Sequence, residues 1–172
     1  MLSAILIFIA WTVAAFIGME LLSYALHRWV FHGVLWKIHV THHTKQHTLL
    51  EANDLFAIFF TGLAFVLLLI GFLRDPLRSA EFPIGLGMTI YGMLYFVIHD
   101  LMTHRRFYPL KPFQGWMDVV RRAHLRHHQS AEKDGLEPYG LFLFPYSKFR
   151  HPPERRSASR PQDIEQDAST NQ

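Results

Sequence analysis

An uncharged apolar stretch at residues 55–73 constrains this fold more than any other feature of the sequence. A helix of that length crosses the hydrocarbon core of a bilayer, which is about 30 Å thick. Inside lipid the backbone must satisfy its own hydrogen bonds, so only helices and closed barrels span membranes. Residues 2–22 form a second apolar segment with one charge, Glu20, and residues 82–98 form a third. We therefore predict an all-α integral membrane protein with three transmembrane helices.

The remaining segments are assigned by length and composition. Residues 139–149 are too short to span and are predicted to lie at the interface or in a re-entrant position, which leaves a fourth membrane element open. Residues 152–172 have no aromatic side chain and one large aliphatic, so a disordered polar tail follows a single membrane domain at 1–151. The third apolar segment carries small residues suited to close helix packing, Gly85, Gly87 and Gly92.

Charge limits the partners and predicts the topology. The net charge of +3 would permit nucleic-acid binding, but the hydropathy pattern favours an anionic membrane surface or an acidic protein, so no nucleic acid is expected. Arg28, Lys37 and Lys45 lie between the first two apolar segments, and twelve further Lys and Arg follow residue 98. The positive-inside rule then places the N-terminus outside the cell, and the first loop and the C-terminal half in the cytoplasm, with the chain in the plasma (inner) membrane.

Ten of the twelve histidines belong to a motif pair that occurs twice, His-x4-His followed by His-x2-His-His. The first copy is His27, His32, His39, His42 and His43, and the second is His99, His104, His124, His127 and His128. Neutral imidazole ligates zinc, copper, iron and nickel, so ten at paired spacings predict a metal site. The absence of cysteine excludes thiolate zinc sites and Cys-ligated iron–sulfur clusters. His47 and His151 lie outside the motifs and are not predicted to be ligands.

The motif spacings predict how the imidazoles meet. In His-x2-His-His, positions i, i+3 and i+4 share one helical face and can point at one region. Residues 116–131 fit such a helix, because Trp116, Val120, Ala123 and His127 form a stripe.

The His-x4-His spacing is different, because positions i and i+5 are about 140° apart on a regular α-helix. Such a pair meets a common centre through a bend, a π-bulge or two metals approached from different sides. The first helix is predicted to run to about residue 32, with Gly33 as its terminator. Ten ligands suit two metals of about five ligands each, held in a helical cap beyond the membrane helices.

Several other residues are candidates for supporting roles. Glu20, Asp54 and Asp100 could orient ligand histidines, although Glu20 is also explained as an interfacial charge and Asp54 as a helix cap; Asn53 is a weaker candidate. Aromatic residues at helical spacing could line an apolar substrate channel or simply pack: Tyr91, Tyr95 and Phe96. A basic set could dock an acidic protein or anionic headgroups, or be solvated: Arg121, Arg122 and Arg126.

The chain resembles the membrane fatty-acid hydroxylase and desaturase superfamily, and within it the bacterial-type β-carotene 3-hydroxylase family. The matching stretches are HRWVFHGVLWKIHVTHH, EANDLFAIFF, GMTIYGMLYFVIHDLMTHRRF and AHLRHHQSAEKDG, whereas LEPYGLFLFP matches only loosely. The resemblance implies a non-haem di-iron mono-oxygenase, with the ten motif histidines as ligands and zinc able to replace iron in purified protein. It also implies dioxygen as oxidant, a reduced ferredoxin-type electron donor, and a carotenoid substrate dissolved in membrane lipid.

The implied reaction inserts one oxygen atom into the C3–H bond of a β-ionone ring, while the other oxygen leaves as water. Both rings would react in turn, from β-carotene through β-cryptoxanthin to zeaxanthin, and ketolated rings would give astaxanthin from canthaxanthin. Two alternatives stay open at this point. One is a fatty-acyl or sterol hydroxylase or desaturase, and the other is a metal- or haem-binding membrane transporter.

Overall fold

The computed structural model describes residues 1–44, 50–107, 110 and 114–151, so the predicted tail and His47 lie outside the described residues. The element order is α1 (Leu2–Ala25), π-helix η1 (Leu26–Val34), α2 (Trp36–His43), α3 (Asp54–Arg74), α4 (Glu81–Tyr95), π-helix η2 (Phe96–Thr103), α5 (Trp116–His127) and α6 (Tyr146–Phe149). Every regular element in this part of the chain is helical. Among the described residues, three continuous helices are long and apolar enough to cross a membrane, Leu2–Val34, Asp54–Arg74 and Glu81–Thr103, which confirms the predicted membrane fold.

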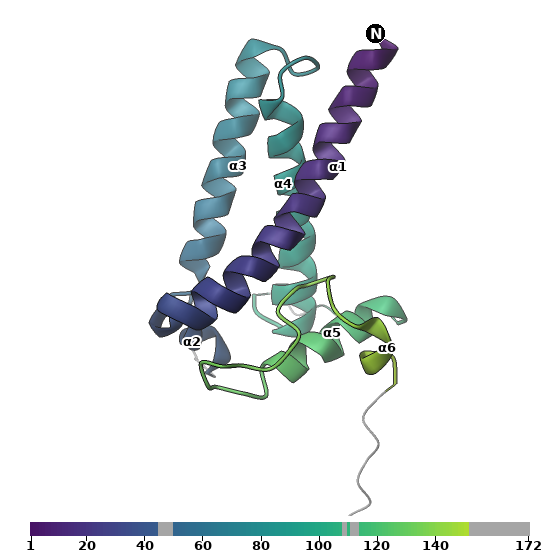
Figure 1. The fold of residues 1–172 in the computed structure, drawn as a ribbon. Helices are drawn as coiled ribbons and strands as arrows, with labels where there is room; N and C mark the ends of the chain where they lie inside the picture. The colour runs from purple at the N-terminus through teal and green to yellow at the C-terminus, as the bar shows by residue number, and fades with distance from the viewer. Residues whose placement is uncertain (45–49, 108–109, 111–113, 152–172) are drawn as a thin grey trace, which may run out of the picture.

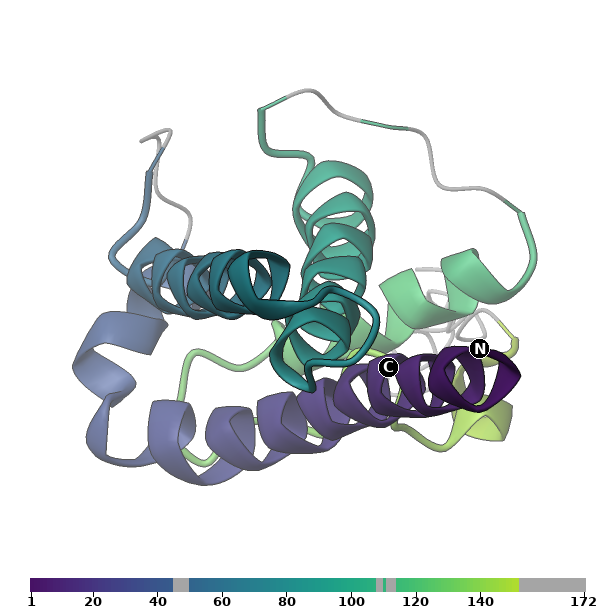
Figure 2. The ribbon, with the colours of Figure 1, turned by 90° about the horizontal axis from the view of Figure 1, so that it is seen from above.

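Helix α4 is the centre of the bundle, because α1 and α3 each pack against it rather than against each other (Figure 2). Glycines permit both contacts. A Cβ on Gly87 would lie 2.3 Å from the carbonyl oxygen of Thr12 in α1, and a Cβ on Gly85 would lie 2.9 Å from the backbone nitrogen of Leu68 in α3. The packing prediction is wrong for Gly92, whose Cβ position has no atom within 4 Å. That glycine lines a cavity instead.

The first and third membrane helices both end in a π-helical segment. In η2 the backbone N–H of His104 donates to the carbonyl of His99, five residues earlier, at 2.9 Å. This bond stacks position i+5 above position i, so the structure adopts the π-bulge alternative for both His-x4-His motifs. Gly33 has non-helical backbone angles (φ −107°, ψ −113°), and there the chain turns from η1 into α2.

Short helices from both halves of the chain cover one end of the bundle. Figure 1 shows α2, α5 and α6 gathered at the end opposite the N-terminus; we call these helices and residues 128–145 the cap. A buried cluster joins cap and bundle, consisting of Ile98, Met102, Val120 and Leu141. Of the predicted α5 stripe, Trp116 alone is exposed (47%). Residues 139–149 do not form a fourth spanning helix, because only Tyr146–Phe149 are helical there.

Candidate metal centre

The ten motif histidines converge at the junction of bundle and cap in two groups of five. The first imidazole group is His27, His32, His39, His43 and His127. The second imidazole group is His42, His99, His104, His124 and His128. Within each group, one nitrogen of every ring lies within 4.8 Å of the others. Seven of the ten side chains are buried, and the remaining three are half-buried.

The two groups do not correspond to the two sequence copies. Each π-helix delivers both of its histidines to one group, because residues i and i+5 are stacked there. Each His-x2-His-His helix is divided between the groups. The outer pair, at i and i+4, goes to one group, while the middle histidine, His42 or His127, crosses to the other. One short helix therefore contributes ligands to both centres, which fixes the centres side by side.

The far ring nitrogen, Nδ1, of four imidazoles donates to a backbone carbonyl in the segment 130–139. The pairs are His27 with Tyr139 (2.6 Å), His32 with Lys133 (2.9 Å), His43 with Ser130 (2.9 Å) and His127 with Leu136 (2.5 Å). All four acceptor residues follow the last motif, and two of them, Leu136 and Tyr139, lie in the loosely matching part of the chain. Nothing in their side chains signals this role. Backbone carbonyls of this kind fix the tautomer and orientation of metal-ligating histidines.

The His32 and His127 pair tests whether the arrangement fits a metal. A carbonyl oxygen only accepts, so Nδ1 of both rings carries the proton and Nε2 of both rings is a bare acceptor. Yet the two Nε2 atoms face each other at 3.2 Å. Two lone pairs at that distance repel unless a cation lies between them and the other imidazoles. Metal–nitrogen bonds of about 2.1 Å at right angles separate their nitrogens by about 3.0 Å, so the donor set fits a metal.

Carboxylates instead of carbonyls lie beside Nδ1 of two rings of the second imidazole group. Nδ1 of His42 donates to Glu51 Oε2 at 3.0 Å, and Asp100 Oδ2 lies 3.4 Å from Nδ1 of His99, without hydrogen-bond geometry. The guanidinium of Arg106 pairs with Asp100 at 2.9 Å and Glu51 at 3.9 Å. The sequence patterns did not predict a role for Glu51 or Arg106 at the site. The only sequence signal for them is their position, nine residues after His42 and two residues after His104.

Asp54 and the neighbouring Asn53 have different partners. Asp54 accepts two bonds from Arg106, at 2.7 and 2.8 Å, and one from the Glu51 N–H at 2.9 Å, so it contacts the ion-pair network and the helix start rather than an imidazole. The neighbouring Asn53 Oδ1 accepts from Nδ1 of His39 at 2.7 Å. The weaker sequence candidate is thus the one in contact with a histidine.

Glu20 is buried in α1 and reaches the centre through the backbone. Its Oε1 accepts the N–H groups of Phe142 and Leu143 at 2.8 and 2.7 Å, and its Oε2 accepts the hydroxyl of Tyr91 at 2.9 Å. These bonds hold the segment that carries the Tyr139 carbonyl against His27. Glu20 is therefore placed to position a histidine indirectly.

Burial keeps imidazoles at the end of the bundle neutral. Burial first, and neighbouring imidazoles second, lower the pKa of His39 to about 3, of His43 to about 4 and of His104 to about 2. Neutral imidazole is the form that ligates metals. At physiological pH these rings are ready to bind a cation without first losing a proton.

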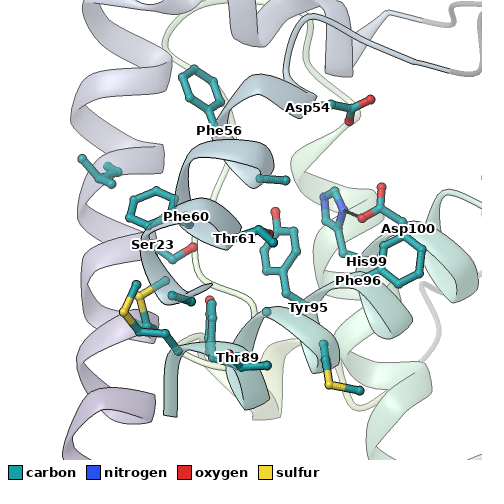
Figure 3. Close-up of a pocket in the computed structure, with 18 of the residues that line it drawn as sticks. Ser23, Asp54, Phe56, Phe60, Thr61, Thr89, Tyr95, Phe96, His99 and Asp100 are labelled. Atoms are coloured by element: carbon teal, nitrogen blue, oxygen red, sulfur yellow. Dashed lines mark ion pairs between the residues drawn. The ribbon is translucent and has the colours of Figure 1, made fainter. Parts of the chain in front are cut away.

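A cavity of about 540 Å³ extends from the imidazole groups into the bundle between α1, α3 and α4. Tyr91, Tyr95 and Phe96 all line it, as the channel prediction requires, together with His27, His39 and His99. Figure 3 shows Tyr95, Phe96 and His99 in this lining. The Tyr95 ring stacks on the His99 ring, with centroids 4.4 Å apart. Most of the remaining lining is apolar. An apolar molecule in this cavity would reach both imidazole groups.

The other predicted positions lie outside the centre. Arg122 binds Asp118 and donates to the Phe149 and Arg150 carbonyls at 3.0 and 3.1 Å, so it joins α5 to α6. Arg126 is exposed, Arg121 is half-buried, and His151 is exposed and belongs to neither imidazole group.

Comparison with known proteins identifies the family of this chain. Residues 12–147 match the model of the fatty acid hydroxylase family. The chain belongs to that family. It is 36% identical to a β-carotene hydroxylase of Paracoccus sp. (strain PC1) over 155 residues, covering 88% of this chain and 93% of the relative. It is 34% identical to the β-carotene hydroxylase of Pantoea ananas, over 84% of this chain and 82% of the relative.

A plant protein is also similar to this chain. The chloroplastic β-carotene 3-hydroxylase 1 of Arabidopsis thaliana is 39% identical over 139 residues, which covers 79% of this chain and 44% of the relative. No solved structure matches the chain.

Proposed function

We propose that this chain is a membrane mono-oxygenase that hydroxylates C3 of β-ionone rings, converting β-carotene through β-cryptoxanthin to zeaxanthin. The observation that carries the proposal is the junction of two five-imidazole groups with an apolar cavity inside the membrane bundle. The relatives named β-carotene hydroxylase favour a carotenoid over a fatty-acyl or sterol substrate. Canthaxanthin, whose rings differ by a keto group, is proposed as a second substrate giving astaxanthin.

The ten motif histidines are the proposed ligands of two iron ions. All-imidazole donors suit redox iron, and a bound iron pair would supply the activation of dioxygen. The chain's own contribution is geometric. The carbonyls of 130–139 and the carboxylates of Glu51 and Asp100 orient the imidazole rings. The aromatic side chains of the cavity lining keep water from the β-ionone ring of the substrate. Zinc found in purified protein would not identify the working metal, because the affinity order favours zinc over Fe(II).

The test is carotenoid analysis of cells that accumulate β-carotene and express the chain. We expect zeaxanthin in these cells, and neither zeaxanthin nor β-cryptoxanthin in matched cells expressing His127→Ala. Iron content of the purified protein is measured in parallel. Iron-loaded wild-type protein that leaves β-carotene unchanged would contradict the carotenoid assignment, and a Soret band would point to a haem carrier instead.

A reduced ferredoxin is the proposed electron donor. Ferredoxins are acidic, and basic side chains are exposed on the cap at Arg126 and Lys148 and just beyond it at Arg150. Opposite charges steer association in a way that salt screens. Turnover with reduced ferredoxin should therefore fall as ionic strength rises, and Arg126→Glu should lower the rate at low salt only. A rate independent of salt would exclude an electrostatically docked donor.

The N-terminus is proposed to face the outside, with both imidazole groups on the cytoplasmic side of the plasma membrane. The excess of Lys and Arg after residue 98 supports this orientation. Because the chain has no cysteine, single cysteines can report it. In intact cells, an impermeant thiol reagent should label Leu77→Cys, in the loop between α3 and α4, and should not label Gln129→Cys in the cap. The reverse pattern would invert the topology.

A further inference from the structure

The exposed residues of the cavity lining gather on one side of the bundle. Three of them have large side chains on the outer surface of α3, α4 or η2: Phe65 (64% exposed), Met93 (65%) and Phe96 (44%). The lining residues of α1 and η1 are all buried or half-buried. On that side Phe31 stacks on Phe56, with ring centroids 3.9 Å apart. The cavity is therefore walled off toward η1 and reaches the surface between α3 and α4.

The two ends of this opening are defined by contacts between the same helices. At one end α3 and α4 touch, because the Cβ position of Gly85 lies within about 3.0 Å of Leu68 and Ala64. At the other end Asp54, at the start of α3, binds Arg106, just beyond η2. This ion pair ties the helices together on the metal-centre side. Between the two contacts α3 and α4 diverge (Figure 1), and exposed residues of both helices line the cavity there.

Gly92 lies in this interval and leaves it open. It lines the cavity, it is exposed, and a Cβ built on it meets no atom within 4 Å. It follows Gly85 by seven residues on the same helix, so it faces the same neighbour, α3. Gly85 allows α3 and α4 to touch. Gly92 lies farther along α4, where it leaves a space between the two helices. The opposite wall is formed by Thr61 of α3, which is also exposed and lines the cavity.

We infer that the apolar ring of a lipid-dissolved substrate enters the cavity sideways from the bilayer, between α3 and α4 past Gly92 and Thr61. The inference rests on the proposed function for the identity of the substrate. The occupant is apolar because the mouth is bounded by Phe65, Met93 and Phe96, and it comes from lipid because these side chains lie on membrane-spanning helices. A long polyene attached to the ring would remain between the helices and in the bilayer. Gly92 is then a specificity-determining residue, since a large side chain at this position would close the entrance.

The test fills the entrance from each wall separately, with Gly92→Phe and Thr61→Phe. The matched control is Gly62→Phe, which adds the same ring to α3 at an exposed position where a Cβ also meets no atom within 4 Å and which is not part of the lining. Each full-length protein is reconstituted in lipid nanodiscs that contain β-carotene. The readouts are carotenoid retained per protein, measured by absorbance after removal of free lipid, and metal bound per protein.

We expect each plug variant to retain about tenfold less carotenoid than wild type, with unchanged metal, whereas Gly62→Phe matches wild type in both. Gly92→Ala, which adds only a methyl group, should bind normally. Wild-type carotenoid retention by both plug variants would overturn the entrance. Metal loss from both would overturn it as well, because these positions would then support the imidazole groups. If only one plug variant loses metal, the carotenoid retained by the other variant tests the entrance. Failure of wild-type protein to form zeaxanthin would instead count against the proposed function.

Discussion

At the scale of single residues, the proton on each imidazole decides what the ring can bind. Carbonyls on Nδ1 of His32 and His127 leave two bare nitrogens 3.2 Å apart, an arrangement that only a cation stabilises. Group membership follows from this geometry rather than from the motif in which a histidine is found. His39 and His42 are three residues apart in α2 and yet belong to different groups.

Metal counts of double variants test this membership. His42→Ala combined with His99→Ala removes two ligands from one group, so about one metal per chain should remain. His39→Ala combined with His42→Ala removes one ligand from each group, and the count should fall toward zero although both changes lie in one motif. Elemental analysis of purified protein measures both. One metal retained in the second pair would mean that each sequence copy holds its own ion.

Glu20 gives a second prediction at this scale. Glu20→Ala removes the acceptor of the half-buried N–H groups of Phe142 and Leu143, at a cost of about 1 kcal/mol each. The Tyr139 carbonyl then loses its support, and metal affinity at the first imidazole group should fall by about tenfold or more. Glu20→Gln keeps an acceptor oxygen and should restore most of the affinity, as measured by chelator competition. Equal affinity in wild type and Glu20→Ala would remove Glu20 from any positioning role.

At the scale of elements, the spacing of the histidines predicts the helices better than it predicts which imidazole group each histidine joins. The i, i+3, i+4 motif correctly places three histidines on a short helix, but helical geometry alone does not show that the middle ring crosses to another group. The i, i+5 motif requires a departure from the α-helix, and the π-helices provide it. The segment 130–139 is unpredictable from side chains, because it contributes backbone carbonyls.

Gly135 tests whether that segment controls the metal centre. It has φ of +59°, and a Cβ there would lie 2.9 Å from Cε1 and Nδ1 of His32. Gly135→Ala should therefore displace the His32 ring and lower metal affinity. Gly115→Ala is the control for backbone strain, since Gly115 has φ of +89° but no atom within 4 Å of its Cβ position. Both variants should lose some thermal stability, and only Gly135→Ala should lose metal in chelator competition. Equal metal loss in the two would mean that strain alone is responsible.

At the scale of the whole molecule, hydropathy and charge are enough to predict three membrane helices followed by a cap. They do not predict that α4 is central. That order depends on which glycine faces which neighbour, and Gly85, Gly87 and Gly92 look alike in sequence while one contacts α3, one contacts α1 and one lines the cavity. The cavity arises from the same order. Because α1 and α3 pack on α4 and not on each other, an apolar space remains between them and leads to the imidazoles.

The metal-free protein should lose its fold as the pH falls below about 6.5, the ordinary pKa of histidine. In the folded cap the pKa of His43 is lowered to about 4 and that of His39 to about 3, so these rings stay neutral where an unfolded chain would bind protons. The unfolded state therefore gains protons first, and stability falls through the window from about pH 6.5 to about pH 3. By pH 5.5 each such histidine costs about 1 kcal/mol.

Thermal unfolding of the metal-free protein in detergent, followed by tryptophan fluorescence, measures this loss. We expect a steep fall in Tm between pH 7.5 and 5.5. His151→Ala should keep the same slope, because His151 is exposed and outside both groups. A Tm that is flat across this range would show that the rings are already protonated or solvated in the folded cap. Adding metal at pH 7.5 should raise Tm, since the ion binds the folded state that brings the ten imidazoles together.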